Sequence, residues 1–472
     1  MKKETNSAMI LCGFDRRIQE LQAEIAKIMG NGAIKNGAEG LHELESSIQR
    51  LNGELIDLLA AKKLQEALDS EFTRDQALKI IRALPSKFKN FGLRLTPVRM
   101  SNGTTVFVLT PYFARPCFEK NPTKRGIGFY PAFLVLGIFD KCSPRLASEV
   151  SMAAAALASI KEAQDMLAAR GCELDFKTIR NIVKRFAARA RACQERGDIP
   201  EENLDIADCR VVISIDGGRI RIRKNKKGQK TKNGRRRYHT DWREPKLFII
   251  YVIDDDGRQK KTFSPVIDAS LNGPENIIAL LGFYLRKMDI CKASSVSVIA
   301  DGARWIWERT TALLAALGMK VEQIHFVLDF YHAVEHLSNL LDLLKWPSAD
   351  RKSYLTKYRR ILLKGKTNAF FEFVESISKR SRSKEIIRER KYFTKNKTKM
   401  QYSRFAAIKL PLGSGAVESA IRRVINLRLK GPGIFWLEDT ANEMLMLRCY
   451  YKAKRWGMLN KMASSLARIE VV

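Results

Sequence analysis

The segment between residues 210 and 330 constrains the fold most, because strand-like and helix-like stretches follow one another there in a definite order. Apolar, β-branched runs predict five strands, over residues 211–215, 247–253, 261–267, 295–300 and 323–328. Helical periodicity predicts one helix after the third strand and one after the fourth, over residues 274–288 and 305–317. The order β-β-β-α-β-α-β predicts an α/β core in which helices cover a sheet.

Three acidic residues occupy positions where ligands bind in such a core. Asp216 ends the first strand, Asp301 follows the fourth, and Glu418 lies in a helix that begins after residues 413–415, Gly-Ser-Gly. Strand ends form the ligand-binding edge of an α/β sheet, and carboxylate oxygens suit Mg²⁺ or Mn²⁺. Each acid also has an ordinary explanation: respectively a turn, a helix N-cap, and an ion pair with Arg422. The apolar strands that lead into both aspartates favour a shared metal site.

The charge of the chain indicates what it binds. Its 84 Lys and Arg residues outnumber its 51 Asp and Glu residues, which gives a formal net charge of +33. Lys and Arg bind phosphates and release counterions, so this excess predicts a polyanion such as nucleic acid. No apolar stretch reaches the roughly 18 to 20 residues of a membrane span, and no signal-peptide cleavage site is found. The eight cysteines include no Cys-x-x-Cys pair, which predicts reduced thiols in the cytoplasm.

Residues 1–90 are mainly helical in pattern, with leucine and isoleucine residues spaced three and four apart over residues 16–68. This spacing predicts a helical hairpin that packs within its own domain, or a short coiled-coil seam between two chains. Residues 91–200 begin with two strand-like runs joined by residues 101–103, Ser-Asn-Gly, and an Asn-Gly pair predicts a β-hairpin turn.

A helix-turn-helix outline follows in residues 143–190. An alanine-rich helix is followed by a turn at Gly171 and then by a helix with one basic side. The second helix of such a motif contacts the major groove of DNA. The candidates for this contact are Lys177, Arg180, Lys184 and Arg185. The alternative is an ordinary amphipathic helix whose charges are only solvated.

The sequence around the three acids resembles a known family. Asp216 stands in Ile-Ser-Ile-Asp-Gly, Asp301 in Ile-Ala-Asp-Gly, and Glu418 in Gly-Ser-Gly-Ala-Val-Glu-Ser. These motifs resemble the RNase H-like catalytic domain of DDE transposases from bacterial insertion sequences, over roughly residues 205–455. The most specific portion comprises residues 411–431, 435–436 and 445–448. Residues 329–332, Asp-Phe-Tyr-His, also look like the Asp-x-x-His signature that follows the fifth strand in several transposase groups.

The resemblance implies how the chain is organised. An RNase H-like core would begin in residues 205–330, and a basic helical insertion would occupy residues 331–405. C-terminal helices over residues 406–472 would complete the core. The mostly α-helical region before it, made of residues 1–90 and 91–200, would bind DNA. The expected fold class is therefore α/β, with a helical insertion in the core.

The resemblance also implies a function. The chain would be a transposase that binds the terminal inverted repeats of an insertion sequence, cleaves DNA strands there and joins them to target DNA. Asp216, Asp301 and Glu418 would hold two Mg²⁺ ions, for which Mn²⁺ would substitute. One ion activates water and later a DNA 3′-hydroxyl, and the other stabilises the leaving 3′-oxygen. Because two double-stranded ends must be handled together, a homodimer or a larger assembly is expected on DNA.

Alternatives to this function remain open. Asp329 and His332 are expected to line the rim of the active site near DNA, or else to form a plain buried ion pair or a solvated face. Residues 332–336 also match H-x-x-E-H, the zinc motif of inverzincin metalloproteases, but a protease would leave the net charge and the strand-end aspartates unexplained. The other possibilities are an RNase H-like DNA nuclease without strand transfer and a catalytically silent, transposase-derived DNA-binding protein.

Basic residues flank the expected active site. Residues 219–237 contain 11 Lys or Arg among 19 positions, followed by Tyr238 and Trp242, whose rings can stack on unpaired bases. This stretch is expected either to contact DNA beside Asp216 or to be a flexible, solvated loop. Basic residues of the Glu418 helix are expected to follow the DNA backbone. The candidates are Arg219, Arg221, Arg223, Lys224, Arg235, Arg236, Arg237, Arg422, Arg423, Arg428 and Lys430.

Overall fold

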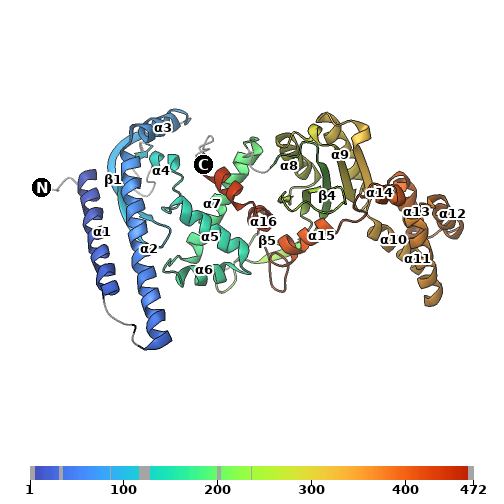
Figure 1. Cartoon of the computed structure of the whole chain (residues 1–472), viewed down its shortest axis with the longest axis horizontal. Helices are drawn as coiled ribbons and strands as arrows, with labels where there is room; N and C mark the ends of the chain where they lie inside the picture. Colours follow the sequence, from blue (N-terminus) through green and yellow to red (C-terminus); the bar gives the residue numbers. More distant parts are fainter. Residues whose placement is uncertain are drawn as a thin grey trace. The chain divides into compact units, whose positions relative to one another are not determined.

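The computed structural model describes residues 6–30, 34, 36–85, 87–115, 128–198, 204–234 and 236–465. The chain divides into two compact units (Figure 1). Unit 1 comprises residues 1–193 and 460–472, and unit 2 comprises residues 194–459. Both contain helices and strands, so the mixed α/β class is confirmed. The seven cysteines among the described residues are free thiols.

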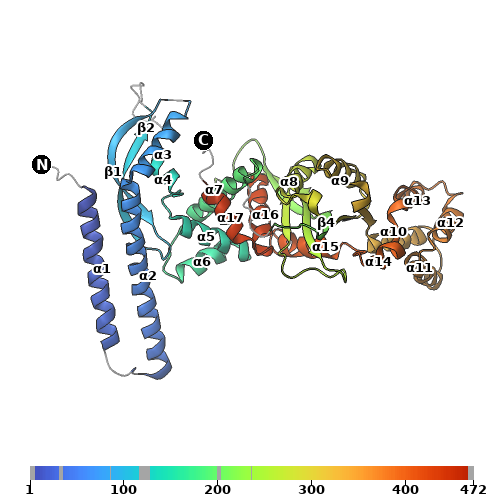
Figure 2. The ribbon, with the colours of Figure 1, turned by 45° about the horizontal axis from the view of Figure 1, so that its top comes forward.

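Unit 1 is built from helices and a small antiparallel sheet. Its elements are α1 (Ser7–Gly30), α2 (Gly37–Asp69), α3 (Glu71–Arg82), β1 (Lys89–Arg99), β2 (Thr105–Ala114), β3 (Gly128–Phe129), α4 (Pro131–Val135), α5 (Pro144–Ala156), α6 (Ile160–Ala168) and α7 (Phe176–Glu195). α1 and α2 lie side by side as a hairpin (Figures 1 and 2). Leu21 and Leu51 of this hairpin are buried in one core with Val98 and Val108 of β1 and β2. The leucine spacing therefore serves packing within the unit.

Asp57 of α2 holds the turn between β1 and β2. Its buried carboxylate accepts hydrogen bonds from the N–H groups of Asn102 and Thr104 at 3.0 and 3.1 Å. The Ser101 hydroxyl donates a further hydrogen bond to it at 3.2 Å. The predicted Asn-Gly turn is present, and Gly103 has a φ of +94°.

Helices α5, α6 and α7 follow the predicted helix-turn-helix outline, with the turn at Gly171, whose φ is +80°. On α7, Ile179 and Ile182 are buried. Its four DNA-contact candidates are all exposed, namely Lys177, Arg180, Lys184 and Arg185. Arg185 also forms an ion pair with Asp140 at 3.0 Å. The helix is therefore amphipathic, as both interpretations of its basic side require.

Unit 2 contains a five-stranded mixed sheet and a separate hairpin. The strands are β4 (Arg210–Gly217), β5 (Ile220–Asn225), β6 (Tyr238–Arg243), β7 (Lys246–Ile253), β8 (Val266–Ser270), β9 (Ser295–Ala300) and β10 (Ile324–Leu328). The sheet has the order β10-β9-β4-β7-β8. β4, β9 and β10 are parallel, whereas β7 is antiparallel to both β4 and β8. Seven consecutive residues of β7 are buried, which indicates that both faces of the sheet are covered.

The helices of unit 2 cover this sheet and form the insertion. They are α8 (Pro274–Lys287), α9 (Arg304–Ala316), α10 (Phe330–Leu343), α11 (Ser348–Leu363), α12 (Thr367–Ser378), α13 (Lys384–Asn396), α14 (Tyr402–Ala407), α15 (Gly415–Ile421), α16 (Glu438–Lys452) and α17 (Trp456–Ser464), whose end belongs to unit 1. Four short helices complete the set: η1 (Ile290–Lys292), η2 (Val321–Gln323), η3 (Lys397–Lys399) and the π-helix η4 (Arg422–Asn426). α8 packs on β7 and β8, and α15 packs on β4 and β7. Helices α11, α12 and α13 gather beyond α10, away from β4 (Figures 1 and 2).

Two parts of unit 2 differ from the sequence prediction. The third strand of the sheet, β8, begins at Val266 and not at residue 261, because the preceding Pro265 has no N–H for a sheet hydrogen bond. The basic stretch over residues 219–237 is not a loop throughout, because its first part forms β5, which pairs with β6. The two isoleucines of β5 are buried, and arginines alternate with them. Buried and more exposed side chains therefore follow the two-residue repeat of a β-strand, even in this highly charged stretch.

Asp57→Ala is expected to lower the free energy of unfolding by about 1–3 kcal/mol, because it removes the buried acceptor of several hydrogen bonds from the β1–β2 turn. Urea unfolding followed by circular dichroism measures this loss. Asp75→Ala, which removes an exposed carboxylate of α3, is the control and should leave the curve unchanged. Coincident curves for the two variants would show that Asp57 does not hold the turn.

Candidate metal centre

Three parallel strands of unit 2 end in aspartates at the same edge of the sheet. β4 and β9 pair in register up to two positions before Asp216 and Asp301. β9 and β10 pair up to the residues just before Asp301 and Asp329. Aligned residues of parallel strands face the same side, and adjacent strands lie about 4.8 Å apart. The register therefore brings three carboxylates together.

The buried carboxylate of Asp329 connects three parts of unit 2. It caps α10 by accepting hydrogen bonds from the N–H groups of Tyr331 at 2.6 Å and His332 at 3.0 Å. It also accepts a hydrogen bond from the Ser414 N–H at 2.6 Å, in the Gly-Ser-Gly loop. The Ser414 hydroxyl in turn donates to Glu418 Oε1 at 2.9 Å. Asp329 thus fixes the loop that brings the acid of α15 to the edge of the sheet.

One group of side chains among the described residues has the geometry of a metal site. The ligand atoms of Asp329, His332 and Glu418 all lie within 4.8 Å of one another. His332 Nδ1 is 3.5 Å from Asp329 Oδ2, which is an ion-pair distance but too long for a hydrogen bond. Two carboxylates and an imidazole in this arrangement could hold a metal ion.

This group differs from the one expected from the sequence, which assigns the metal to Asp216, Asp301 and Glu418. Asp329 and His332 form an ion pair and lie next to Glu418. Asp216 and Asp301 do not belong to the three-residue group, but the charges of Asp301, His332 and Glu418 all act on Asp216. All five side chains therefore face one region at the end of the sheet.

The electrostatics of the site favour a cation. Burial raises the pKa of Asp216 to about 6, and the negative charges of Asp301 and Glu418 add to this effect. Burial alone would raise the pKa of Asp329, but its contact with His332 and the hydrogen bonds from Ser414 lower it to about 2. The contact with Asp329 raises the pKa of His332 to about 9. The Asp329–His332 ion pair thus lies near three carboxylates, those of Asp216, Asp301 and Glu418. The negative charges of Asp301 and Glu418 repel that of Asp216, and a bound cation would relieve this repulsion.

Close packing holds the Glu418 helix against the sheet. Gly218 follows β4 directly, and a Cβ there would lie 2.7 Å from Ile425, so glycine allows the close approach. α15 continues into the π-helix η4. The buried Arg448 of α16 donates a hydrogen bond to the Val424 carbonyl at 2.6 Å and another to the Arg423 carbonyl. These bonds satisfy carbonyl groups that the irregular helix would otherwise leave without donors.

The helical insertion contacts the loop that carries Asp301. Tyr392 of α13 donates a hydrogen bond to the Asp301 carbonyl at 3.0 Å. The next residue, Gly302, has a φ of +102°. A Cβ at Gly302 would lie 2.8 Å from the Tyr392 ring and 3.0 Å from the Asn396 side chain. The insertion therefore shapes this loop, and both its dihedral angle and its surroundings require glycine.

The two histidines of the H-x-x-E-H motif face different carboxylates. His332 faces Asp329, whereas His336 Nδ1 lies 2.5 Å from Glu389 Oε2 on α13. The His336 ring also stacks on Tyr392, with 3.6 Å between the ring centres. Among the described residues, His336 belongs to no group that could hold a metal ion. The motif therefore ties the insertion together and does not form the zinc site of a metalloprotease.

Most of the basic candidates near the site lie on the surface. Exposed are Arg219, Lys224, Arg236, Arg237, Arg422 and Lys430, and partly buried are Arg221, Arg223 and Arg423. Arg235 lies outside the described residues. Arg428 corrects the prediction, because it is only 5% exposed and its guanidinium lies 5.2 Å from the centre of the Trp436 ring. A side chain buried in this way packs within the protein and does not contact DNA phosphates.

Comparisons of the chain with protein-family models, with curated proteins and with solved structures find no match. In the part of the chain that the structure describes, no helix is both long and apolar enough to cross a membrane. The function must therefore be argued from the site itself.

Gly302→Ala is expected to lower the free energy of unfolding by about 1–3 kcal/mol, because a side chain is strained at this φ. Its new methyl group would also meet Tyr392. Gly457→Ala is the matched control, because nothing lies within 4 Å of the added methyl group there and its φ is not positive. Urea unfolding compares the two. Equal stability of both variants would contradict the contact between α13 and the Asp301 loop.

Proposed function

We propose that this chain is a DDE-type transposase, with an RNase H-like catalytic core in unit 2. The proposal rests on Asp216 and Asp301, which follow adjacent parallel strands, and on Glu418, a distant residue whose charge acts on Asp216. The element order of the sheet and the helical insertion before the Glu418 helix agree with the family resemblance. A DNA substrate also explains the net charge of +33.

Asp216, Asp301 and Glu418 are the proposed ligands of two Mg²⁺ ions, since Mg²⁺ prefers oxygen ligands and Mn²⁺ accepts the same set. When bound, the ions would supply an activated water or 3′-hydroxyl and would neutralise charge on the leaving oxygen. The mutual repulsion of these carboxylates is the feature that fits a dication. Asp329 differs from them, because three N–H groups already occupy its oxygens.

Asp329 and His332 have a supporting role in this proposal. Asp329 positions Glu418 through Ser414, and it keeps a positive charge on the neighbouring imidazole. The cationic His332 would donate a hydrogen bond to a phosphate oxygen of the DNA strand. Binding and orientation of the scissile phosphate would therefore come from His332, and metal binding from the three carboxylates.

The hairpin of β5 and β6 is the proposed contact to DNA beside the site. The guanidinium carbon of Arg221 lies 5.6 Å from the centre of the Trp242 ring and 4.7 Å from the centre of the Phe435 ring. Trp242 is 54% exposed and Tyr238 is 44% exposed, so rings that could stack on bases accompany the basic side chains. In unit 1, the basic side of α7 would bind the inverted repeats. A homodimer on double-stranded DNA, acting at the bacterial nucleoid in the cytoplasm, belongs to the same proposal.

Asp216→Asn is expected to reduce strand cleavage by about 10³-fold or more, because metal ions supply several kcal/mol of transition-state stabilisation. Asp301→Asn and Glu418→Gln should have the same effect. The assay incubates the full-length protein and Mg²⁺ with DNA that flanks its own coding sequence, and separates the products on denaturing gels. Asp255→Asn, an exposed aspartate in the turn after β7, is the matched control and should keep full activity.

The products separate this proposal from its alternatives. Cleaved ends that are joined to a target plasmid support a transposase, whereas cleavage without joining supports a nuclease. Binding without cleavage under both Mg²⁺ and Mn²⁺ would indicate a catalytically silent DNA-binding protein. Cleavage that survives Asp216→Asn would contradict the proposed metal ligands.

A further inference from the structure

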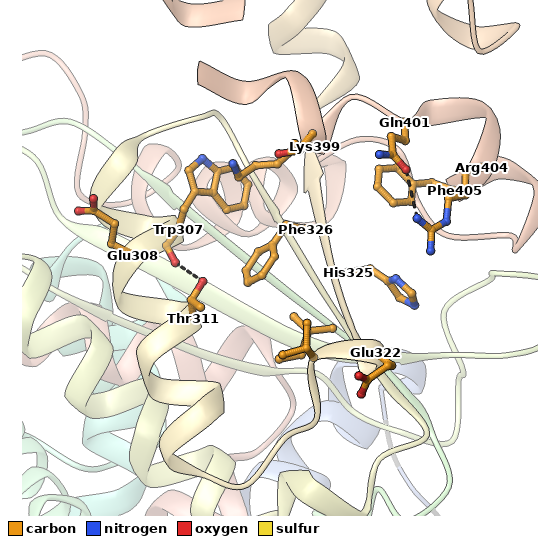
Figure 3. A pocket seen from close by; sticks show the side chains of 13 residues that line it. Trp307, Glu308, Thr311, Glu322, His325, Phe326, Lys399, Gln401, Arg404 and Phe405 are labelled. Carbon is orange, nitrogen blue, oxygen red and sulfur yellow. Dashed lines mark hydrogen bonds between the residues drawn. The ribbon is translucent and has the colours of Figure 1, made fainter. Parts of the chain in front are cut away.

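A hollow of about 700 Å³ lies beside β10, the outer strand of the sheet (Figure 3). Its walls come from α9, from the first residues of β10, and from residues 398–405 around η3 and α14. A strand rises about 3.3 Å per residue, so His325 in the hollow lies about 13 Å along the chain from Asp329. The hollow is therefore separate from the candidate metal centre, and its volume suits a small-molecule ligand.

Two hydrogen-bond donors of this hollow have no acceptor among the described residues. Trp307 is only 7% exposed, and its Nε1–H has no hydrogen-bond partner among the described residues. The Lys399 ammonium lies 5.4 Å from the centre of the Trp307 ring, and Figure 3 shows its side chain reaching toward that ring. No carboxylate pairs with Lys399 in the described part of the chain. Buried donors nearly always have acceptors, so the Trp307 N–H, with the partly exposed Lys399 ammonium beside its ring, points to an anionic ligand.

Both basic and acidic side chains line the rest of the hollow. Arg404 lines the same hollow and donates a hydrogen bond to Gln401 Oε1 at 3.2 Å. Burial lowers the pKa of His325, and the positive charges of Arg404 and Arg210 lower it further. Two acids also line the hollow. Glu308 is paired with Arg304 outside it and points away from Lys399 in Figure 3, whereas Glu322 is exposed.

The remaining walls of the hollow are aromatic. Trp307 and Phe326 meet edge to face, with 5.9 Å between their ring centres, and Phe405 lies on the opposite wall. An aromatic surface next to a cationic end favours a ligand that has both a flat ring and an anionic group. A nucleotide has these two parts in one molecule.

We propose that this hollow binds a nucleotide, with its phosphate at Lys399 and the Trp307 N–H and its base against the aromatic residues that line the hollow. The nucleotide would be either a free nucleotide or the terminal residue of a DNA strand, because both offer the same phosphate and base. The inference does not rest on the proposed catalysis, since the hollow and the carboxylates occupy different ends of β10.

Isothermal titration of the full-length protein with ADP, in EDTA to exclude divalent metals, tests the proposal. Lys399→Gln is expected to weaken ADP binding by roughly tenfold or more, because a charged hydrogen bond is lost. Trp307→Phe keeps an aromatic ring at this position but removes the N–H, and it should weaken binding about threefold or more. Lys364→Gln, an exposed lysine at the end of α11, is the matched control and should bind like the parent.

Competition identifies the source of the nucleotide. Displacement of ADP by a 5′-phosphorylated single-stranded oligonucleotide supports a DNA end, and ADP binding that the oligonucleotide leaves unchanged supports a free nucleotide. Absence of ADP binding, or equal affinity in the parent, Lys399→Gln and Trp307→Phe, would overturn the proposal. The same titration on Asp216→Asn should give the parental affinity, so the result stands apart from whether the protein cleaves DNA.

Discussion

The carboxylate of Asp329 is the interaction on which the candidate site depends. It ends the outermost parallel strand, caps the first helix of the insertion and accepts the N–H of Ser414. The insertion separates the sheet from α15 by a long stretch of chain, so the position of Glu418 cannot follow from the sheet alone. Ser414 links Asp329 at the end of the sheet to Glu418 of α15, because its N–H donates to Asp329 and its hydroxyl donates to Glu418. The contact with His332 and the hydrogen bonds from the His332 and Ser414 N–H groups hold this carboxylate ionised, which explains its low pKa.

The insertion is tied to the core by contacts beside this junction. Tyr392 reaches the carbonyl of Asp301, and His336 stacks on Tyr392 while it contacts the buried Glu389. These contacts connect helix α13 of the insertion to the loop that carries Asp301. A motif that resembles a zinc site in sequence thus has a structural role, because its two histidines face carboxylates on different elements.

Local patterns in the sequence predict much of unit 2. The strands that lead into Asp216 and Asp301 and the two helices that follow are near their predicted positions, because apolar β-branched runs and helical periodicity are local signals. β8 was misplaced because its start depends on Pro265. β5 was missed because its two buried isoleucines stand among many charges, although their alternation with arginines was a usable signal.

The site itself was only partly predictable. Asp329 positions Glu418 because it accepts a hydrogen bond from Ser414, which lies far along the chain. No local sequence pattern predicts that contact. Arg428 was expected at the surface on the grounds of its charge alone, whereas tertiary packing places it over Trp436. The Trp307 N–H, which has no hydrogen-bond partner among the described residues, and the hollow beside β10 have no sequence signature. Each depends on the packing of α9 near residues 398–405 at the end of the insertion.

The most direct test of the two-metal proposal is a crystal structure of the protein soaked in Mn²⁺, with the ions located by anomalous scattering. Two ions held by Asp216, Asp301 and Glu418, at about 2.1 Å from their carboxylate oxygens, are the predicted result. Asp329 should keep its hydrogen bonds to α10 and Ser414. An ion held by Asp329 and His332 with no contact to Asp216, or no ion at this edge of the sheet, would contradict the proposal.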